Sequence, residues 1–181
     1  MTLHRSLLLA VLLLGCSDGI VGDPLTPSPH SGAPGTTLFA PERATFALVD
    51  DVLQATCGTL DCHGQVGRAL RLSGGRGLRL SAKDNPADDP TTPAEYDRSY
   101  WSVIGLEPEV MSDVVRDGGR TPERLTIVRK ARALEHHKGG KLFEVGDERD
   151  RCLTSWLAGD LDLDACRAGK ELMRPGATSE P

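Results

Sequence analysis

The stretch CGTLDCHG, residues 57–64, constrains the fold more than any other part of the sequence. It places four residues between Cys57 and Cys62 and puts His63 directly after the second cysteine. Thiols form disulfides and thioethers and bind metals, and imidazole is the commonest metal ligand among side chains. The backbone between the cysteines must therefore close a small loop, whether the sulfurs bond to each other or to something else.

The first residues have the features of a bacterial export signal. Arg5 precedes an apolar run from Leu7 to Leu14, which is too short to span a bilayer permanently. The run ends in Leu-Leu-Gly-Cys16, which resembles the lipobox of bacterial lipoproteins, where the cysteine is acylated and begins the mature chain. We expect residues 1–15 to be a signal peptide and Cys16 to carry the lipid. The alternative is an ordinary secretory signal with an incidental cysteine.

The predicted signal peptide and lipidated Cys16 imply that the protein lies in the cell envelope, periplasmic or at the surface, and is anchored to a bacterial membrane. The chain has 21 Lys and Arg against 26 Asp and Glu, and removal of Arg5 with the signal makes the balance more acidic. Such a charge argues against nucleic acid as a partner. Four cysteines remain after Cys16, and in an oxidising compartment an even count indicates disulfides. Local spacing favours Cys57 with Cys62 and Cys152 with Cys166.

Composition divides the rest of the chain into a tether, one domain and a tail. Residues 16–40 are rich in Pro, Gly, Ser and Thr and have too few apolar side chains to pack, so they predict a flexible tether. Residues 41–168 are long enough for one modest domain, and residues 169–181 are expected to form a flexible tail. We predict that the domain is loop-rich and mainly α, with a small β-hairpin.

The helices are predicted from apolar spacing and from residues that begin and end helices. A helix from Pro41 would place Phe46, Val49, Leu53 and Thr56 on one face and lead directly into the first cysteine of the motif. A second helix is expected from Asp147, as N-cap, to a stop at Gly159.

Three other segments give weaker patterns. Residues 70–81 repeat Leu-Arg-Leu-Ser around Gly-Gly-Arg-Gly, which predicts the hairpin. Residues 96–115 predict one or two short helices, and residues 125–128 a strand or a short helix.

The chemistry of the motif is that of covalent haem attachment. In such proteins two thiols add to the haem vinyl groups, and the histidine after the second thiol binds the iron. The usual spacing is C-x-x-C-H, whereas four residues separate Cys57 from Cys62 here. The competing interpretation is a disulfide between these two cysteines, with His63 in a structural role. A zinc site made of Cys57, Cys62, His63 and His137 is a weaker third interpretation, since zinc motifs favour shorter gaps between cysteines.

Three segments together resemble the cytochrome c-like domain of planctomycete and myxobacterial envelope proteins. They are Cys62-His63-Gly64, Gly77-Leu78-Arg79-Leu80 and Trp156-Leu157-Ala158-Gly159. The resemblance covers residues 41–160 and implies a cytochrome c-like fold. It also implies haem c held by Cys57 and Cys62, with His63 as an iron ligand. The Met-Pro-Pro segment that often supplies the sixth ligand in that family is missing from this chain.

A six-coordinate iron would therefore need another donor. His137, in the segment EHHKGG of residues 135–140, is the preferred candidate, because the glycines after it would let an imidazole approach a flat macrocycle. His136 and Met111 are the alternatives. An imidazole would keep the reduction potential lower than a thioether would.

These observations favour an electron carrier or binding module over an enzyme, and we expect no catalytic residues. The first hypothesis is a lipid-anchored monohaem c-type cytochrome-like protein that exchanges electrons with a redox partner protein. The second is a non-catalytic envelope lipoprotein that is stabilised by disulfides and holds no haem. A haem sensor or peroxidase with an open sixth position is a third hypothesis.

Overall fold

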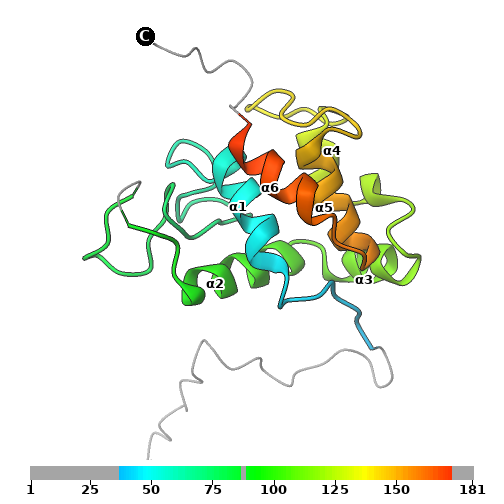
Figure 1. Cartoon of the computed structure of the whole chain (residues 1–181), viewed down its shortest axis with the longest axis horizontal. Coiled ribbons are helices and arrows are strands. Elements are labelled where there is room, and N and C mark those ends of the chain that lie inside the picture. The colour runs from blue at the N-terminus through cyan, green and yellow to red at the C-terminus, as the bar shows by residue number, and fades with distance from the viewer. Residues whose placement is uncertain (1–36, 87–88, 173–181) are drawn as a thin grey trace, which may run out of the picture. The chain divides into compact units, whose positions relative to one another are not determined.

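The computed structural model describes residues 37–86 and 89–172. The predicted signal peptide, Cys16 and most of the predicted tether lie outside these residues. The described part is mainly helical, and none of its helices is long and apolar enough to cross a membrane. Its elements, shown in Figure 1, are α1 (Phe46–Cys57), α2 (Pro93–Ile104), α3 (Pro108–Arg116), the 3₁₀ helix η1 (Pro122–Arg124), α4 (Thr126–Ala131), α5 (Glu148–Ala158) and α6 (Leu163–Glu171).

Helix α1 has the predicted buried face but begins at Phe46 rather than at Pro41. A helix that began at Pro41 would need the carbonyls of Pro41 and Glu42 for its own backbone hydrogen bonds. The carbonyl of Pro41 accepts a hydrogen bond from the Tyr100 hydroxyl (3.0 Å), and that of Glu42 accepts one from the Trp156 indole (2.8 Å). Side chains of α2 and α5 thus engage these carbonyls. At its other end α1 leads into the motif, as predicted, with Cys57 as its last residue.

Helix α5 matches the prediction at both ends. The Asp147 carboxylate accepts a hydrogen bond from the backbone N–H of Asp150 at 2.8 Å, and Gly159 ends the helix with a φ of 79°. That left-handed conformation favours glycine, which has no Cβ to clash.

Helix α6 was not predicted, although its N-terminus carries a recognisable cap. The Asp162 carboxylate accepts a hydrogen bond from the Ala165 N–H at 2.8 Å, so Asp162 caps the start of the helix. The helix continues to Glu171 and buries Gly169 against the backbone of Arg149. The predicted tail from residue 169 is therefore helical over its first residues. At the other boundary, Phe39 of the predicted tether donates its N–H to the Ser112 hydroxyl of α3 at 2.9 Å.

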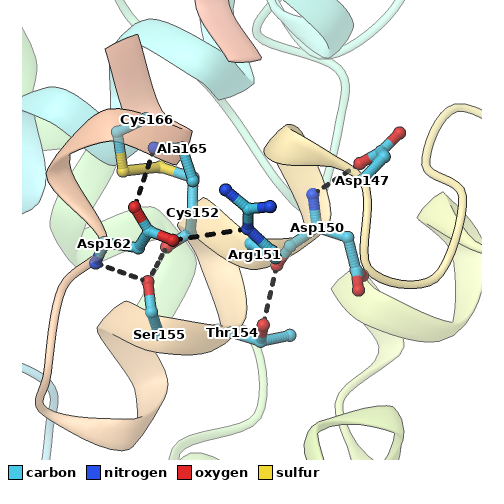
Figure 2. Close-up of a disulfide and its surroundings, with 9 residues drawn as sticks. All are labelled: Asp147, Asp150, Arg151, Cys152, Thr154, Ser155, Asp162, Ala165 and Cys166. Atoms are coloured by element: carbon cyan, nitrogen blue, oxygen red, sulfur yellow. Dashed lines mark hydrogen bonds and ion pairs between the residues drawn. A yellow bond between two sulfur atoms is a disulfide. The ribbon is translucent and has the colours of Figure 1, made fainter. Parts of the chain in front are cut away.

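The predicted disulfide between Cys152 and Cys166 is present and joins α5 to α6 (Figure 2). The two Cα atoms lie 4.6 Å apart, within the range that disulfides span. Beside the bond, the Ser155 hydroxyl donates to the Cys152 carbonyl (3.1 Å) and accepts from the Asp162 N–H (2.9 Å). Helix α6 packs on both α1 and α5 (Figure 1), so the disulfide fixes the end of the described chain to the core.

The core contains an aromatic cluster that joins three helices. The ring of Phe46 in α1 lies 5.4 Å from that of Tyr100 in α2 and 5.1 Å from that of Trp156 in α5, between centroids. All three side chains are buried. Phe46 thus sets the position of the α1 N-terminus relative to α2 and α5.

The predicted β-hairpin of residues 70–81 is not confirmed. This segment holds one isolated bridge, between Ser73 and Leu78, and the residues that the structure describes contain no strand. Two of its backbone N–H groups bond to serine side chains of α2 instead of to a neighbouring strand. Arg71 donates to the Ser102 hydroxyl (2.8 Å) and Ser73 donates to the Ser99 hydroxyl (2.9 Å).

The remaining predictions resolve into helices. Residues 96–115 fall in two helices, α2 and α3, and Pro108 starts the second. Residues 125–128 begin the short helix α4 rather than a strand.

Candidate functional site

A cavity of about 700 Å³ lies where α1, the motif and the segment after α4 meet. Both cysteines of the motif line it, together with His63, His136 and His137. Its apolar lining residues are Leu53, Ala69, Leu70, Leu106, Ile127, Ala131, Leu142 and Phe143. The structure therefore brings two segments that are distant in the sequence to one apolar cavity.

The motif forms a tight loop closed by its own backbone. His63 donates its N–H to the carbonyl of Cys57, and Cys62 donates its N–H to the carbonyl of Thr59, each at 2.9 Å. Cys57 is buried at the end of α1, whereas Cys62 is half-buried. These bonds hold both sulfur-bearing residues and the histidine on one short stretch of wall.

His63 is oriented by a backbone carbonyl. Its Nδ1 lies 3.0 Å from the oxygen of Leu70. A carbonyl can only accept, so Nδ1 carries the hydrogen and Nε2 is left as the electron-pair donor. Burial lowers the pKa of His63, and the hydrogen bond with the Leu70 carbonyl partly opposes that shift. The charges of His137, Arg68 and Lys130 lower the pKa further. The neutral imidazole, which is the metal-binding form, is therefore favoured.

His137 is also oriented by a backbone carbonyl. Its Nδ1 lies 3.3 Å from the carbonyl oxygen of Gly140, and Gly140 returns its N–H to the carbonyl of His137 at 3.0 Å. Gly140 has a φ of 71°, which favours glycine. A Cβ at Gly139 would lie 2.9 Å from Cε1 of His137, so the imidazole lies directly against Gly139.

The two imidazoles lie close together, and both line the cavity. Their ring centroids are 6.2 Å apart and their planes are inclined by 24°. Of the alternatives to His137, His136 also lines the cavity. Met111 does not, because its side chain is buried in the core on α3.

The cavity lining carries more positive than negative charge in a chain whose net charge is −5. Arg68, Lys130 and Lys138 line it, against Asp61. The Arg68 guanidinium donates to the carbonyls of Cys62 (3.0 Å) and Asp61 (3.2 Å), which braces the motif loop. Such a lining suits a ligand with carboxylate groups. No local sequence pattern predicts these cations as neighbours, because they come from three separate segments.

Across residues 37–86 and 89–172 there is no group of three or more His, Cys, Asp or Glu side chains that could hold a metal ion. A structural zinc ion takes four protein ligands, so the zinc interpretation gains no support. A haem iron is different, since the porphyrin supplies four nitrogens and the protein supplies only axial ligands.

Comparison with known protein families, with curated protein sequences and with solved structures gave no match. The site is therefore interpreted from its own residues.

Proposed function

We propose that this chain is a lipid-anchored, monohaem c-type cytochrome-like electron-transfer protein of the cell envelope. The observation that supports it best is the proximity of His63 and His137, whose ring centroids are 6.2 Å apart in the lining of the cavity that both motif cysteines also line.

The distance between the two imidazoles fits one metal ion between them. An imidazole nitrogen lies about 1.1 Å from its ring centroid and about 2 Å from a metal that it binds, so two imidazoles that both turned Nε2 toward one metal would have centroids up to about 6.2 Å apart. The centroids of His63 and His137 are 6.2 Å apart. In both residues Nδ1 faces a backbone carbonyl, which leaves Nε2 as the donor.

The cavity also suits the size and polarity of a haem. Its volume of about 700 Å³ falls within the usual range for cofactor sites, and its wall is mostly apolar. Cys57 and Cys62 would hold the group as thioethers. Each S–H would add across a vinyl double bond, with sulfur joining one carbon and the hydrogen the other, so the attachment consumes no oxidant or reductant.

The arrangement of the helices supports a cytochrome c-like fold for the domain. Helix α1 ends at the first cysteine of the motif, and Trp156 of α5 packs on Phe46 at its start. Trp156 also belongs to one of the three segments that carry the sequence resemblance.

When bound, the haem would supply a one-electron carrier. The residues of the chain would hold it, keep both imidazoles in place and exclude water along the apolar wall. With His137 rather than a methionine as the sixth ligand, the reduction potential would be low. The buried position of Met111 supports the imidazole. Electrons would pass to and from a redox partner protein.

The Cys152–Cys166 disulfide supports an exported protein, because such bonds persist in oxidising compartments. Together with the lipobox at Cys16, it supports a periplasmic or surface location on a lipid anchor.

Covalent attachment tests the proposal. The full chain is produced in a host that attaches haem to exported proteins, alongside Cys57→Ser and Cys62→Ser variants. We expect the wild-type haem to resist acid-acetone extraction and the peptide with residues 57–63 to carry the mass of a haem. We expect each variant to hold it through a single bond or to lose it.

The second hypothesis, a disulfide-stabilised lipoprotein without haem, is favoured by the Cys152–Cys166 bond alone. A colourless protein with Cys57 and Cys62 joined to each other would contradict haem attachment and establish this alternative.

A further inference from the structure

His63 is supported by residues 70–78, here called the support segment. The Leu70 carbonyl lies 3.0 Å from Nδ1 of His63, and the Leu72 N–H donates to the His63 carbonyl at 2.9 Å. The support segment therefore contacts both the ring and the backbone of the same histidine.

Two glycines allow this close approach. A Cβ at Gly77 would lie 2.1 Å from the carbonyl oxygen of Gly58 and 2.7 Å from the Cα of Gly64. A Cβ at Gly64 would lie 2.0 Å from the same oxygen and 2.8 Å from the Cα of Gly77. These neighbours are backbone atoms, so no side chain can rotate away to make room. Neither glycine has a positive φ, which means that alanine would act through contact alone.

Helix α2 holds the support segment from its other side. The Ser102 hydroxyl accepts the Arg71 N–H at 2.8 Å. The Ser99 hydroxyl accepts the Ser73 N–H at 2.9 Å and donates to the Ser73 carbonyl at 3.1 Å. Because α2 begins with a complete capping box at Thr92 and Glu95, the serines lie on a well-formed helix. A continuous set of contacts thus runs from α2 through the support segment to His63.

We propose that Gly64 and Gly77 are positioning residues for the iron ligand His63. They let the support segment lie against the motif loop, and the Leu70 carbonyl then fixes the direction in which Nε2 points. This inference rests on the proposed function, because it concerns how a haem ligand is held. A displaced support segment would leave Nδ1 without its carbonyl and the ring free to turn.

The test compares four alanine variants of the full chain by visible spectrum and by amide hydrogen exchange. Gly64→Ala and Gly77→Ala carry the proposal. Gly67→Ala is the control near the motif, since the nearest atom to its added Cβ is 3.8 Å away. Gly119→Ala is the control for a tight glycine elsewhere, because its added Cβ would meet the backbone of Ala158 at 2.9 Å and its φ is 70°.

We expect Gly64→Ala and Gly77→Ala to lose the low-spin haem spectrum and to exchange the amides of residues 62–64 faster. Gly67→Ala should resemble the wild type. Gly119→Ala should lower the melting temperature and keep the low-spin spectrum. An unchanged spectrum and unchanged exchange in Gly77→Ala would overturn the proposal, as would the same spectral loss in Gly119→Ala.

If Gly77→Ala yields no folded protein, Ser102→Ala decides the matter. This change loosens the support segment without a clash, so a partial shift to high spin supports the proposal and an unchanged spectrum overturns it. Failure of the proposed function looks different. A wild-type chain without haem would contradict the proposed function. Amide exchange in that haem-free chain would still show whether Gly77 holds the motif loop in place.

Discussion

The imidazole rings of His63 and His137 lie with their centroids 6.2 Å apart and their planes 24° from parallel, although one belongs to the motif after α1 and the other to the turn after α4. Each ring has its Nδ1 at a backbone carbonyl, that of Leu70 or that of Gly140. The two nitrogens that could bind a metal are thus the two Nε2 atoms. This pair is the main reason for proposing six-coordinate iron.

Separate alanine variants of His136 and His137 distinguish the proposed iron ligand from the adjacent histidine. We expect His137→Ala to convert the haem from low spin to high spin and to raise its reduction potential, because one of two imidazole ligands is lost. His136→Ala should leave both unchanged. The absorption spectra and a redox titration of the two variants measure this. Equal spectra for His137→Ala and wild type would assign the sixth position elsewhere or leave it open, as a sensor or peroxidase requires.

The disulfide between α5 and α6 should stabilise the fold without affecting the site. We expect the double variant Cys152→Ala, Cys166→Ala to lose about 3 kcal/mol of unfolding free energy, the value for closing a loop of this length. Urea unfolding under non-reducing conditions measures the loss. The visible spectrum should not change, since neither cysteine lines the cavity. An altered spectrum would mean that the disulfide also positions the haem.

The ion pair of Arg79 and Glu95 is buried, with side-chain exposures of 4% and 0%. Two oxygens of Glu95 accept from the guanidinium, at 2.9 and 3.2 Å. Glu95→Gln keeps a residue type that suits the capping box but leaves Arg79 without its carboxylate, so we expect a loss of about 3 kcal/mol in unfolding free energy. The control is Asp97→Asn on the same helix, which breaks the exposed pair with Arg43 and should cost far less, because solvent screens that pair.

The same carboxylate predicts a dependence on acid. Burial alone would raise the pKa of Glu95, but hydrogen bonds from the Thr92 and Leu80 N–H groups and the Thr92 hydroxyl, together with the charge of Arg79, outweigh burial and lower it. On acidification the unfolded chain therefore takes up this proton first, and stability falls as the pH drops toward the folded pKa. Glu95→Gln should show a shallower fall in acid. An identical slope in wild type and variant would contradict this.

Asp50 should act in the opposite direction. Its side chain is fully buried on α1, and burial raises the pKa of its carboxyl well above the ordinary value. Asp51 and Glu95 raise this pKa further, whereas hydrogen bonds with Gln54 and Ser99 lower it. The unfolded chain loses this proton first as the pH rises, so stability declines above about pH 4. We expect Asp50→Asn to be more stable than wild type near neutral pH and to lose less stability between about pH 5 and 8.

Local signals carried much of the fold. Apolar spacing located α1 and α5, and Asp147 and Gly159 marked the ends of α5 correctly, because caps act within one helical turn. The start of α1 was misplaced because Tyr100 and Trp156, distant in sequence, engage the carbonyls of Pro41 and Glu42. Residues 70–81 alternate as a strand does, yet the N–H groups of Arg71 and Ser73 bond to serines of α2. No pattern within one segment could reveal these contacts.

The sequence predicts the candidate site residues but not the contacts that hold them in place. The motif and the adjacent His136 and His137 stand out by residue type, and the structure places both segments at one cavity. Tertiary packing between segments brings Gly64 against Gly77. It also brings three cations into the cavity lining: Arg68, Lys130 and Lys138. A role for Gly77 could have been sought in the Gly-Leu-Arg-Leu segment that carries the resemblance.

The visible spectrum of the mature protein, purified from the membranes of a host that attaches haem to exported proteins, tests the central claim most directly. The account predicts a coloured protein whose Soret and α bands are those of low-spin iron with two imidazole ligands, and whose colour resists acid-acetone. A colourless protein from that host would contradict it.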